Sequence, residues 1–198
     1  MKTTVILANG DFPRKGSAAR RLLESAGRIV ACDGAADALR RRLGREADFI
    51  VGDLDSCRVR RGQTDARVVH IAEQDTNDLE KAVRFCRGRG WKRLVVVGAT
   101  GGRDDHALGN VFRAMALGVE MITDTGRFIP FAGRLRLCVG KGAPVSVFAT
   151  DRRTRMTSKG LVWPLDAVRF ENLYCATLNR ASRSTVEICS DRPAFVWV

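Results

Sequence analysis

The sequence is poor in the residues that usually build metal-thiolate or disulfide sites. It has two histidines and six cysteines among 198 residues, and no two cysteines form a Cys-x-x-Cys pair. Neither histidine lies near paired cysteines, which argues against a structural zinc site. We therefore expect buried, reduced thiols for the cysteines, which stand at positions 32, 57, 86, 138, 175 and 189.

Long apolar runs are also missing. No run approaches the roughly 18 apolar residues that a membrane-spanning helix needs. The first apolar run, 5–8, is too short for a signal peptide and is followed at once by Asn9-Gly10-Asp11. These absences predict a cytoplasmic protein with no membrane partner.

The remaining composition is that of a globular protein with a strongly basic surface. Apolar residues make up 45% and charged residues 28%, and the length suits one large domain or two small ones. The net charge of +12 comes mainly from arginines, which are spread along the chain with short clusters at 40–42, 60–61 and 152–153. Aromatic residues do not alternate with them, as a base-stacking surface would require. We expect a solvated basic surface and no nucleic-acid partner.

Apolar runs typical of buried strands alternate with helical patterns up to about residue 125. Near-continuous apolar strands separated by helices predict a doubly wound, mainly parallel α/β sheet in a domain spanning 1–125. The expected strands are 3–8, 28–32, 48–51, 67–71, 93–97 and 119–123, and the expected helices are 16–26, 35–43, 77–89 and 106–117.

The pattern changes in 126–198, where short strand-like segments are separated by turns. The expected strands there are 127–131, 134–139, 145–149, 167–171, 185–189 and 194–198. Without a helical period, this region is predicted to be an all-β domain, a small sandwich. A domain of this size is marginally stable alone, so we expect it to pack on the first domain, on a second subunit, or on both.

Acidic residues gather at the ends of the predicted strands in the first domain. They are Asp53 and Asp55, Asp75 and Asp78, and Asp105. The carboxyl ends of strands in an open parallel sheet meet at one crevice, so these side chains should converge. Clustered carboxylates repel one another unless a hard cation holds them together. The sequence therefore predicts a site for Mg²⁺ and a phosphate ester.

The first two acidic pairs also have structural alternatives. Asp53 and Asp55, in Gly52-Asp-Leu-Asp-Ser56, would point the same way in an extended segment and share one metal ion, but Gly, Asp and Ser also favour a turn. Asp75 and Asp78, in Gln74-Asp-Thr-Asn-Asp78, would lie on one side of the helix start, although Asp75 alone could be an N-cap.

The third segment, 98–106, has the composition of an anion-binding loop. Gly101 and Gly102 would let backbone N–H groups approach a phosphate at a helix N-terminus, and Arg103 offers a planar charged fork. The segment matches neither the G-x-G-x-x-G nor the P-loop pattern. His106 fits a hydrogen-bonding role at the helix start or an acid–base role, and we favour the first.

The chain resembles thiamine pyrophosphokinases over essentially its whole length. The resemblance is carried by the segments 52–56, 74–78 and 101–106 and by the β-rich tail with Gly160-Leu-Val-Trp-Pro-Leu165. The resemblance implies transfer of a diphosphate from ATP to the hydroxyl of thiamine, giving thiamine diphosphate and AMP with Mg²⁺. It also implies an α/β domain that binds ATP and Mg²⁺, and a β-sandwich that binds thiamine and forms a homodimer with active sites between subunits.

The resemblance also assigns roles to individual residues. The five aspartates, Asp53, Asp55, Asp75, Asp78 and Asp105, match positions that hold Mg²⁺, and Arg103 matches a phosphate-binding arginine. Asp33 falls among the ligand-binding positions. Asp78 would orient the thiamine hydroxyl or accept its proton, with Gln74 nearby. Trp163 matches an aromatic that stacks on thiamine from the partner subunit, near Thr157 or Ser158, whereas the residue pattern alone allows Trp163 to be a sandwich core residue.

The chain departs from the family pattern at three places. In Asp33-Gly-Ala-Ala-Asp37, Ala35 and Asp37 replace the second glycine and the asparagine of the family pattern. The second departure is Asp75-Thr-Asn-Asp78, and the third is Leu178-Asn179, where a serine is expected at 178. Two alternatives remain open. One is diphosphate transfer to another small alcohol such as a pterin, and the other is a non-catalytic basic module that binds nucleotide or RNA and would tolerate Asp53→Asn.

Overall fold

The computed structural model describes residues 2–55, 64 and 66–198. Within it the chain forms two compact units, Met1–Thr125 and Gly126–Val198, each described below by itself. Ser56, Cys57 and the Arg60-Arg61 pair fall outside the described residues.

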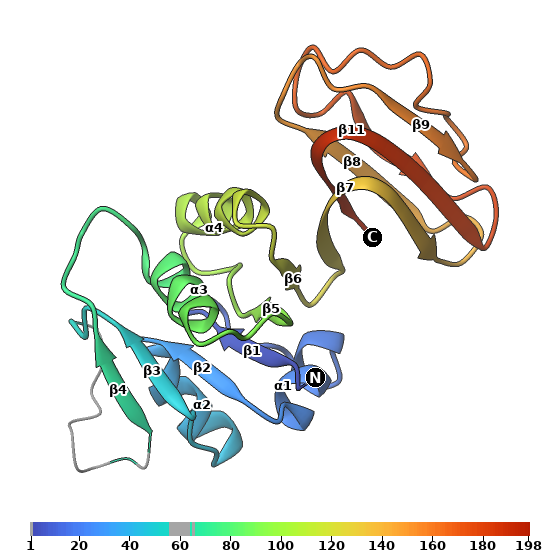
Figure 1. The fold of residues 1–198 in the computed structure, drawn as a ribbon. Coiled ribbons are helices and arrows are strands. Elements are labelled where there is room, and N and C mark those ends of the chain that lie inside the picture. Colours follow the sequence, from blue (N-terminus) through green and yellow to red (C-terminus); the bar gives the residue numbers. More distant parts are fainter. Residues whose placement is uncertain (1, 56–63, 65) are drawn as a thin grey trace. The chain divides into compact units, whose positions relative to one another are not determined.

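Parallel strands form the centre of the first unit. In its described part, strands pair in the order β6-β5-β1-β2-β3-β4, and every pairing is parallel (Figure 1). Every residue of β1, β2 and β3 is buried, which explains why these strands consist mainly of consecutive apolar residues. The strands are β1 (Thr4–Leu7), β2 (Ile29–Cys32), β3 (Phe49–Gly52), β4 (Arg67–His70), β5 (Leu94–Val97) and β6 (Glu120–Ile122).

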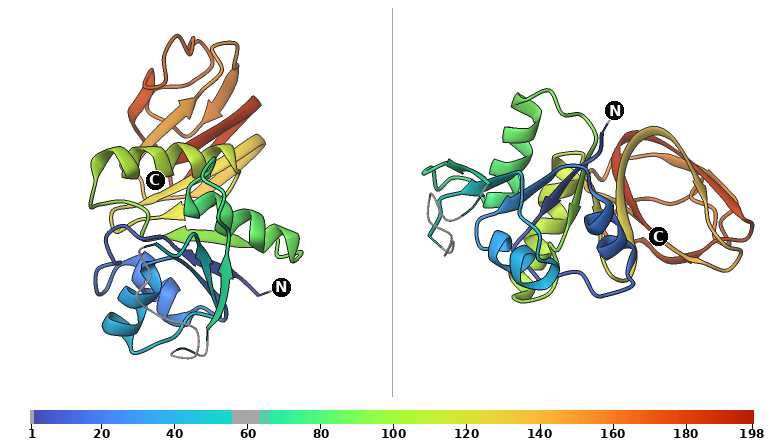
Figure 2. Two further views of the ribbon diagram at one scale, coloured as in Figure 1. Left: turned by 90° about the vertical axis from the view of Figure 1, so that its left-hand side faces the viewer. Right: turned by 90° about the horizontal axis from the view of Figure 1, so that it is seen from below.

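Helices cover both faces of this sheet. The helices are α1 (Ala18–Ser25), α2 (Ala35–Leu43), α3 (Asp78–Gly88) and α4 (Asp104–Ala116). Leu23 of α1 and Leu39 of α2 share one buried core with the strands, and α3 lies on the opposite face (Figure 2). Helix α4 packs beside α3. The chain therefore reverses its direction of winding between β1 and β5, where parallel sheets commonly open a crevice.

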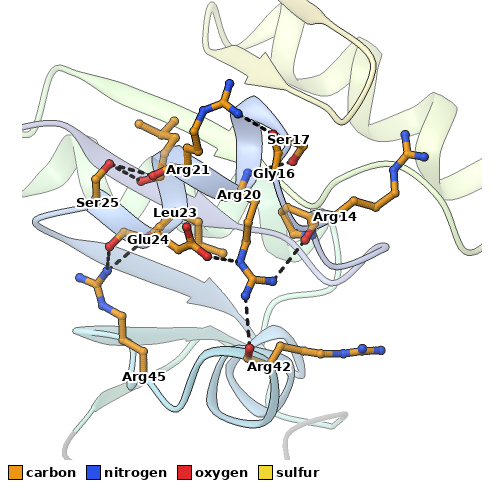
Figure 3. A network of polar contacts seen from close by, with 12 residues as sticks. Arg14, Gly16, Ser17, Arg20, Arg21, Leu23, Glu24, Ser25, Arg42 and Arg45 are labelled. Atoms are coloured by element: carbon orange, nitrogen blue, oxygen red, sulfur yellow. Dashed lines mark hydrogen bonds and ion pairs between the residues drawn. The ribbon is translucent and has the colours of Figure 1, made fainter.

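Several arginines of this unit bind backbone carbonyls at the ends of helices (Figure 3). Arg45 donates to the carbonyl oxygens of Leu23 and Glu24 at 3.1 and 2.8 Å, at the end of α1. Arg20 pairs with Glu24 at 2.7 Å and also donates to the carbonyl of Arg42 at 3.3 Å. Part of the basic composition is thus structural, because these guanidinium groups bind carbonyls at helix ends.

A hollow of about 520 Å³ lies at the amino-terminal ends of β2, β3 and β4. Four arginines line it together with Phe49 and Trp91: Arg28, Arg45, Arg67 and Arg89. Arg28 stacks over the Trp91 ring at 3.8 Å, and Arg89 lies 4.7 Å from the Phe49 ring. The rings stabilise the guanidinium groups through cation–π attraction.

The second unit is β-rich, and its described strands pair antiparallel. The first half of β11 pairs with β7 and β9, and its second half pairs with β7 and β8. Strand β10 pairs with the other edge of β8. The strands are β7 (Arg127–Cys138), β8 (Pro144–Ala149), β9 (Met156–Lys159), β10 (Ala176–Arg180) and β11 (Thr185–Trp197).

The sequence prediction for this unit was wrong in part. Segment 167–171 is not a strand, although Phe170 is buried in the core, so apolar character there reflects burial alone. Strands β9 and β10 were missed because Met156–Lys159 and Ala176–Arg180 are largely polar. Two long strands replace four expected short ones. Strand β7 joins the segments expected at 127–131 and 134–139, and β11 joins those expected at 185–189 and 194–198. Each strand continues through the residues that were expected to form a turn.

The cysteine prediction was also wrong in part. Cys32 and Cys86 are buried free thiols, but Cys138, Cys175 and Cys189 are exposed. Cys138 and Cys189 lie on strands at positions where the alternating pattern points away from the core. Among the described residues, none of the helices is both long and apolar enough to span a bilayer.

Candidate active site

A cleft of about 800 Å³ opens at the carboxyl ends of the strands in the first unit. The loops that follow β1, β3 and β5, and the segment before α3, all contribute to it. The residues predicted from sequence that line it are Asp53, Asp55, Gln74, Asp75, Asp78, Gly101, Gly102, Arg103 and Asp105. Three segments distant in sequence are therefore brought together, as parallel strand topology requires.

Three carboxylates form a close cluster at this cleft. Oxygen atoms of Asp33, Asp53 and Asp78 all lie within 4.8 Å of one another. In the described part of the chain, these three side chains are close enough together to bind one cation. Carboxylate oxygens are the ligands that Mg²⁺ prefers. We refer to these three residues as the acidic cluster.

The backbone around β2 and β3 makes this approach possible. Asp33 follows β2 with a left-handed φ of 38° and is 1% exposed, so its side chain is held inside the protein. Gly52 ends β3, and a Cβ there would lie 3.0 Å from Asp33 Cβ and 3.1 Å from Asp78 Oδ1. A residue larger than glycine at position 52 would therefore make tight contacts with two members of the acidic cluster, which would have to shift slightly.

Asp53 and Asp55 do not share a face of an extended strand, contrary to expectation. The backbone turns at Leu54, where φ is 68°, and the Asp55 N–H donates to Asp53 Oδ1 at 3.4 Å. This is the turn alternative, in which an aspartate side chain accepts from the backbone two residues later. Asp55 lines the cleft without joining the acidic cluster, and its predicted role as a metal ligand stays a prediction.

Lys81 is a functional candidate that the sequence interpretation missed. It lies in the first turns of α3, is 2% exposed, and borders the cleft. Its Nζ is 3.5 Å from Asp53 Oδ2 and 3.3 Å from Asp78 Oδ1. The Asp-x-x-Lys spacing of 78–81 was the available signal, because residues three apart on a helix are neighbours.

The environment shifts the pKa values of these groups in different directions. Partial burial tends to raise the pKa of Asp53. Hydrogen bonds from the Asp55 N–H and Gln74 and the charge of Lys81 outweigh this burial effect, so the pKa of Asp53 is lowered. Burial raises the pKa of Asp78 despite the contact with Lys81, and the charges of Asp53 and Asp55 add to the rise. Burial also raises the pKa of the Cys32 thiol well above its usual range, so this thiol stays protonated.

The segment before α3 places Gln74 and Asp75 at the cleft without a helical conformation. Gln74 donates to Asp53 Oδ2 at 3.2 Å, which ties this segment to the acidic cluster. The N-cap of α3 is Asn77, whose side chain accepts from the Glu80 N–H at 3.0 Å, so the alternative that Asp75 caps the helix is wrong. Asp75 lies outside the acidic cluster, and its role as a metal ligand remains a prediction.

The loop between β5 and α4 contains two left-handed glycines and an ion pair between its own side chains. Gly101 and Gly102 are left-handed, with φ of 78° and 66°, and Arg103 is the N-cap residue of α4. Arg103 binds Asp105 through both carboxylate oxygens, at 3.1 and 2.7 Å. The hydrogen bond and charge of Arg103 lower the pKa of Asp105 to about 2. Asp105 therefore pairs with Arg103 and lies outside the acidic cluster.

The loop after β1 contributes an acidic residue that the sequence interpretation did not include. Asp11 lines the cleft, and its carboxylate packs directly over Gly101, where a Cβ would overlap Asp11 Oδ2. The Asp11 N–H donates to the Thr100 carbonyl at 2.9 Å, which joins the two loops. Its position after the first strand was the signal that could have identified it.

In the second unit, Trp163 is 58% exposed, so the alternative that it is a core residue is wrong. The buried Asn179 holds its backbone from both sides: Asn179 accepts from the Trp163 N–H at 3.2 Å and donates to the Trp163 carbonyl at 2.7 Å. Ser158 accepts from the Leu165 N–H at 2.9 Å, which supports the same loop, and Thr157 is exposed. The unusual Leu178 is 83% exposed with a left-handed φ of 60°.

Comparison with known proteins gives a consistent result for both units. Residues 19–122 match the family model of the thiamin pyrophosphokinase catalytic domain, and residues 126–197 match that of the thiamin pyrophosphokinase substrate-binding domain. A curated relative, thiamin pyrophosphokinase 1 of Caenorhabditis elegans, is 32% identical over an alignment of 111 residues, and the alignment covers 52% of this chain. The matched region spans 46% of that relative's length.

Solved structures show the same fold at low sequence identity. A thiamin pyrophosphokinase family protein from Enterococcus faecalis superposes with a TM-score of 0.77 at 16% identity, covering 98% of this chain and 97% of that one. Thiamin pyrophosphokinase from Candida albicans superposes with a TM-score of 0.76 at 14% identity, covering 98% and 88%. These similarities establish that the fold is shared.

Proposed function

The chain belongs to the thiamin pyrophosphokinase family, and we propose that it transfers a diphosphate from ATP to the hydroxyl of thiamine, giving thiamine diphosphate and AMP. The observation that carries the proposal is the acidic cluster at the carboxyl edge of the sheet, two of whose members, Asp53 and Asp78, line a cleft of about 800 Å³. A cleft of this size suits a nucleotide and a small alcohol together. Transfer of a phosphate chain depends mainly on positioning and charge neutralisation.

The acidic cluster fits Mg²⁺ because it offers three hard oxygen ligands within 4.8 Å of one another. Asp33, Asp53 and Asp78 would hold the ion, which when bound supplies neutralising charge for the phosphate oxygens. The turn at Leu54 and the hydrogen bond from Gln74 support this assignment, since both restrict the orientation of Asp53. Asp55, Asp75 and Asp105, on the same cleft, are proposed to bind further metal ions or their water ligands.

Binding of the phosphate chain is assigned to the loop before α4. The N–H groups near Gly101 and Gly102 and the N-terminus of α4 favour an anion. Arg103 would exchange its bidentate contact with Asp105 for one with phosphate oxygens, since its guanidinium suits both partners. Its planar fork would then balance negative charge on the transferred group or on departing AMP.

In the proposed reaction, the thiamine hydroxyl oxygen forms a bond to the β-phosphorus of ATP. The bond between that phosphorus and the oxygen bridging to the α-phosphorus breaks, and AMP leaves. The hydroxyl proton passes to a base in the cleft, for which Asp78 is the candidate, because its carboxylate lines the cleft.

The second unit is proposed to bind thiamine and to form a homodimer. Support comes from Trp163, whose exposed face suits stacking on a flat cationic ring. Its loop is held by the buried Asn179, and therefore the ring is presented from a fixed backbone. We also infer a sandwich packing for this unit, since the two halves of β11 pair with different strands.

The experiment that tests the proposal is a product assay with purified protein, ATP, Mg²⁺ and thiamine. We expect AMP and thiamine diphosphate in equal amounts, measured by chromatography. ADP in place of AMP would contradict diphosphate transfer. Turnover with a pterin alcohol but not with thiamine would instead support the alternative acceptor, so both alcohols belong in the assay.

A further inference from the structure

Lys81 is unusual because a lysine is rarely buried to this extent. It is 2% exposed, and among the described residues its ammonium has two polar partners, Asp53 and Asp78. Burying a charge is costly unless an opposite charge accompanies it. The lysine and these two carboxylates therefore depend on one another for their place in the folded protein.

Charge counting shows what Lys81 does for the acidic cluster. Three carboxylates within 4.8 Å repel one another strongly when ionised, and Lys81 supplies one positive charge against them. Its two contacts involve carboxylate oxygens of Asp53 and Asp78, both of which also belong to the cluster. A divalent cation bound by the cluster would therefore meet an ammonium already in contact with two of its three ligands.

The contacts of Lys81 are long enough to be exchanged. They measure 3.3 and 3.5 Å, whereas strong charge-assisted hydrogen bonds are about 2.7–2.9 Å. An ammonium has three N–H donors, and within the described residues two are directed at these carboxylates. Lys81 also lines the cleft, so an oxygen of a ligand there could approach its ammonium.

We propose that Lys81 is the resident counter-ion of the acidic cluster, which weakens divalent-cation binding in the empty cleft and makes tight binding depend on the phosphate chain. A phosphate oxygen gives the ammonium a new anionic partner, so the carboxylates become fully available to the metal ion only when nucleotide is present. Metal and nucleotide affinities are then coupled, each increasing the other. This inference rests on the proposed function for the identity of the nucleotide.

A purely structural lysine would behave differently. If Lys81 only supported α3, its removal would lower thermal stability and leave the metal affinity of the folded protein unchanged. If it competes with the cation, its removal increases metal affinity without nucleotide and reduces the advantage that nucleotide gives. The two roles are therefore separated by a binding measurement that needs no turnover.

The test is a calorimetric titration of Mn²⁺ into wild-type, Lys81→Met and Lys81→Arg proteins, with and without α,β-methylene-ATP. We expect Lys81→Met to bind Mn²⁺ about ten-fold more tightly than wild type without nucleotide, because one nearby positive charge is gone. The increase in Mn²⁺ affinity on adding the nucleotide should be smaller for Lys81→Met than for the wild type. Lys81→Arg keeps the charge and should bind Mn²⁺ without nucleotide within about three-fold of wild type.

Equal or weaker Mn²⁺ binding by the folded Lys81→Met protein would overturn the proposal. Should that variant not fold, Lys81→Gln replaces the charge with a polar group and gives the same comparison, with folding checked by circular dichroism. Failure of the thiamine assay would reject the proposed activity. The comparison of Mn²⁺ affinities between wild type and Lys81→Met without nucleotide would still test the role of Lys81. A wild-type Mn²⁺ affinity that does not respond to nucleotide would reject the coupling specifically.

Discussion

The two edges of the parallel sheet carry opposite kinds of polar site. At the carboxyl edge the acidic cluster meets a cleft of about 800 Å³, and at the amino edge four arginines line a hollow of about 520 Å³. The arginines contact aromatic rings and backbone carbonyls of the protein, such as the Trp91 ring under Arg28 and the carbonyls bound by Arg45. The carboxylates instead face each other, with Lys81 as a shared counter-charge.

The contrast indicates at which edge a charged ligand would stabilise the protein more. The amino edge is stabilised by contacts within the protein, so a ligand would have to displace stacked or hydrogen-bonded guanidinium groups. At the carboxyl edge a divalent cation would relieve repulsion that the fold itself imposes. A net charge of +12 thus gives no guide to the candidate active site, which is locally acidic.

The largest expected effect comes from removing one carboxylate of the acidic cluster. Asp78→Asn should lower kcat/KM for thiamine diphosphate formation by at least about 100-fold, since one metal ligand and the candidate base are lost. Folding should survive, because burial already disfavours the ionised form of Asp78. The matched change at the opposite edge, Arg67→Gln, should leave activity within about two-fold. Activity of Asp78→Asn near the wild-type value would contradict the site.

A smaller loss, in metal affinity, is expected when a side chain is added at Gly52 beside the acidic cluster. Gly52→Ala would place a Cβ 3.0 Å from Asp33 Cβ and 3.1 Å from Asp78 Oδ1, so these residues must move apart. We expect roughly ten-fold weaker Mn²⁺ binding by calorimetry, a reduction worth about 1.4 kcal/mol. Gly88→Ala, where a Cβ meets nothing within 4 Å, is the control and should not weaken binding. Equal affinities in both variants would show that Gly52 does not position the cluster.

At the amino edge the expected effect is on stability alone. Arg28→Ala removes the stacking on Trp91 at 3.8 Å and should lower the free energy of unfolding by about 1 kcal/mol. Chemical denaturation measures this change, with Arg41→Ala on the exposed surface of α2 as a control expected within about 0.5 kcal/mol. A large loss of activity in folded Arg28→Ala would break the contrast between the edges.

The smallest effect concerns the titration of Asp105. Its pKa is about 2 because Arg103 binds the ionised form, so this stabilisation is present above the ordinary carboxyl pKa near 4 and is lost as the pH falls through 2. In Arg103→Gln, the pKa of Asp105 should return toward 4. Carbon-13 NMR of the side-chain carboxyl would measure both values. An unchanged midpoint in the variant would mean that Arg103 is not the cause.

Local sequence patterns were sufficient for most of the first unit. Helix α2 occupies Ala35–Leu43, the range expected from its apolar spacing and the terminal Gly44. Strands β1 and β5 lie inside their predicted ranges because fully buried parallel strands need unbroken apolar runs. The second unit was harder, since β9 and β10 are polar strands whose pairing depends on distant partners.

Most of the aspartates at the carboxyl edge could be predicted from sequence, because each follows or precedes a recognisable strand and parallel strands end together; Asp11 was the exception. Tertiary packing was needed to show that Asp33 joins Asp53 and Asp78, that the chain turns at Leu54, and that Lys81 is buried among them. These features depend on contacts between residues far apart in the chain and on single backbone angles. Neither leaves a periodic pattern in the sequence.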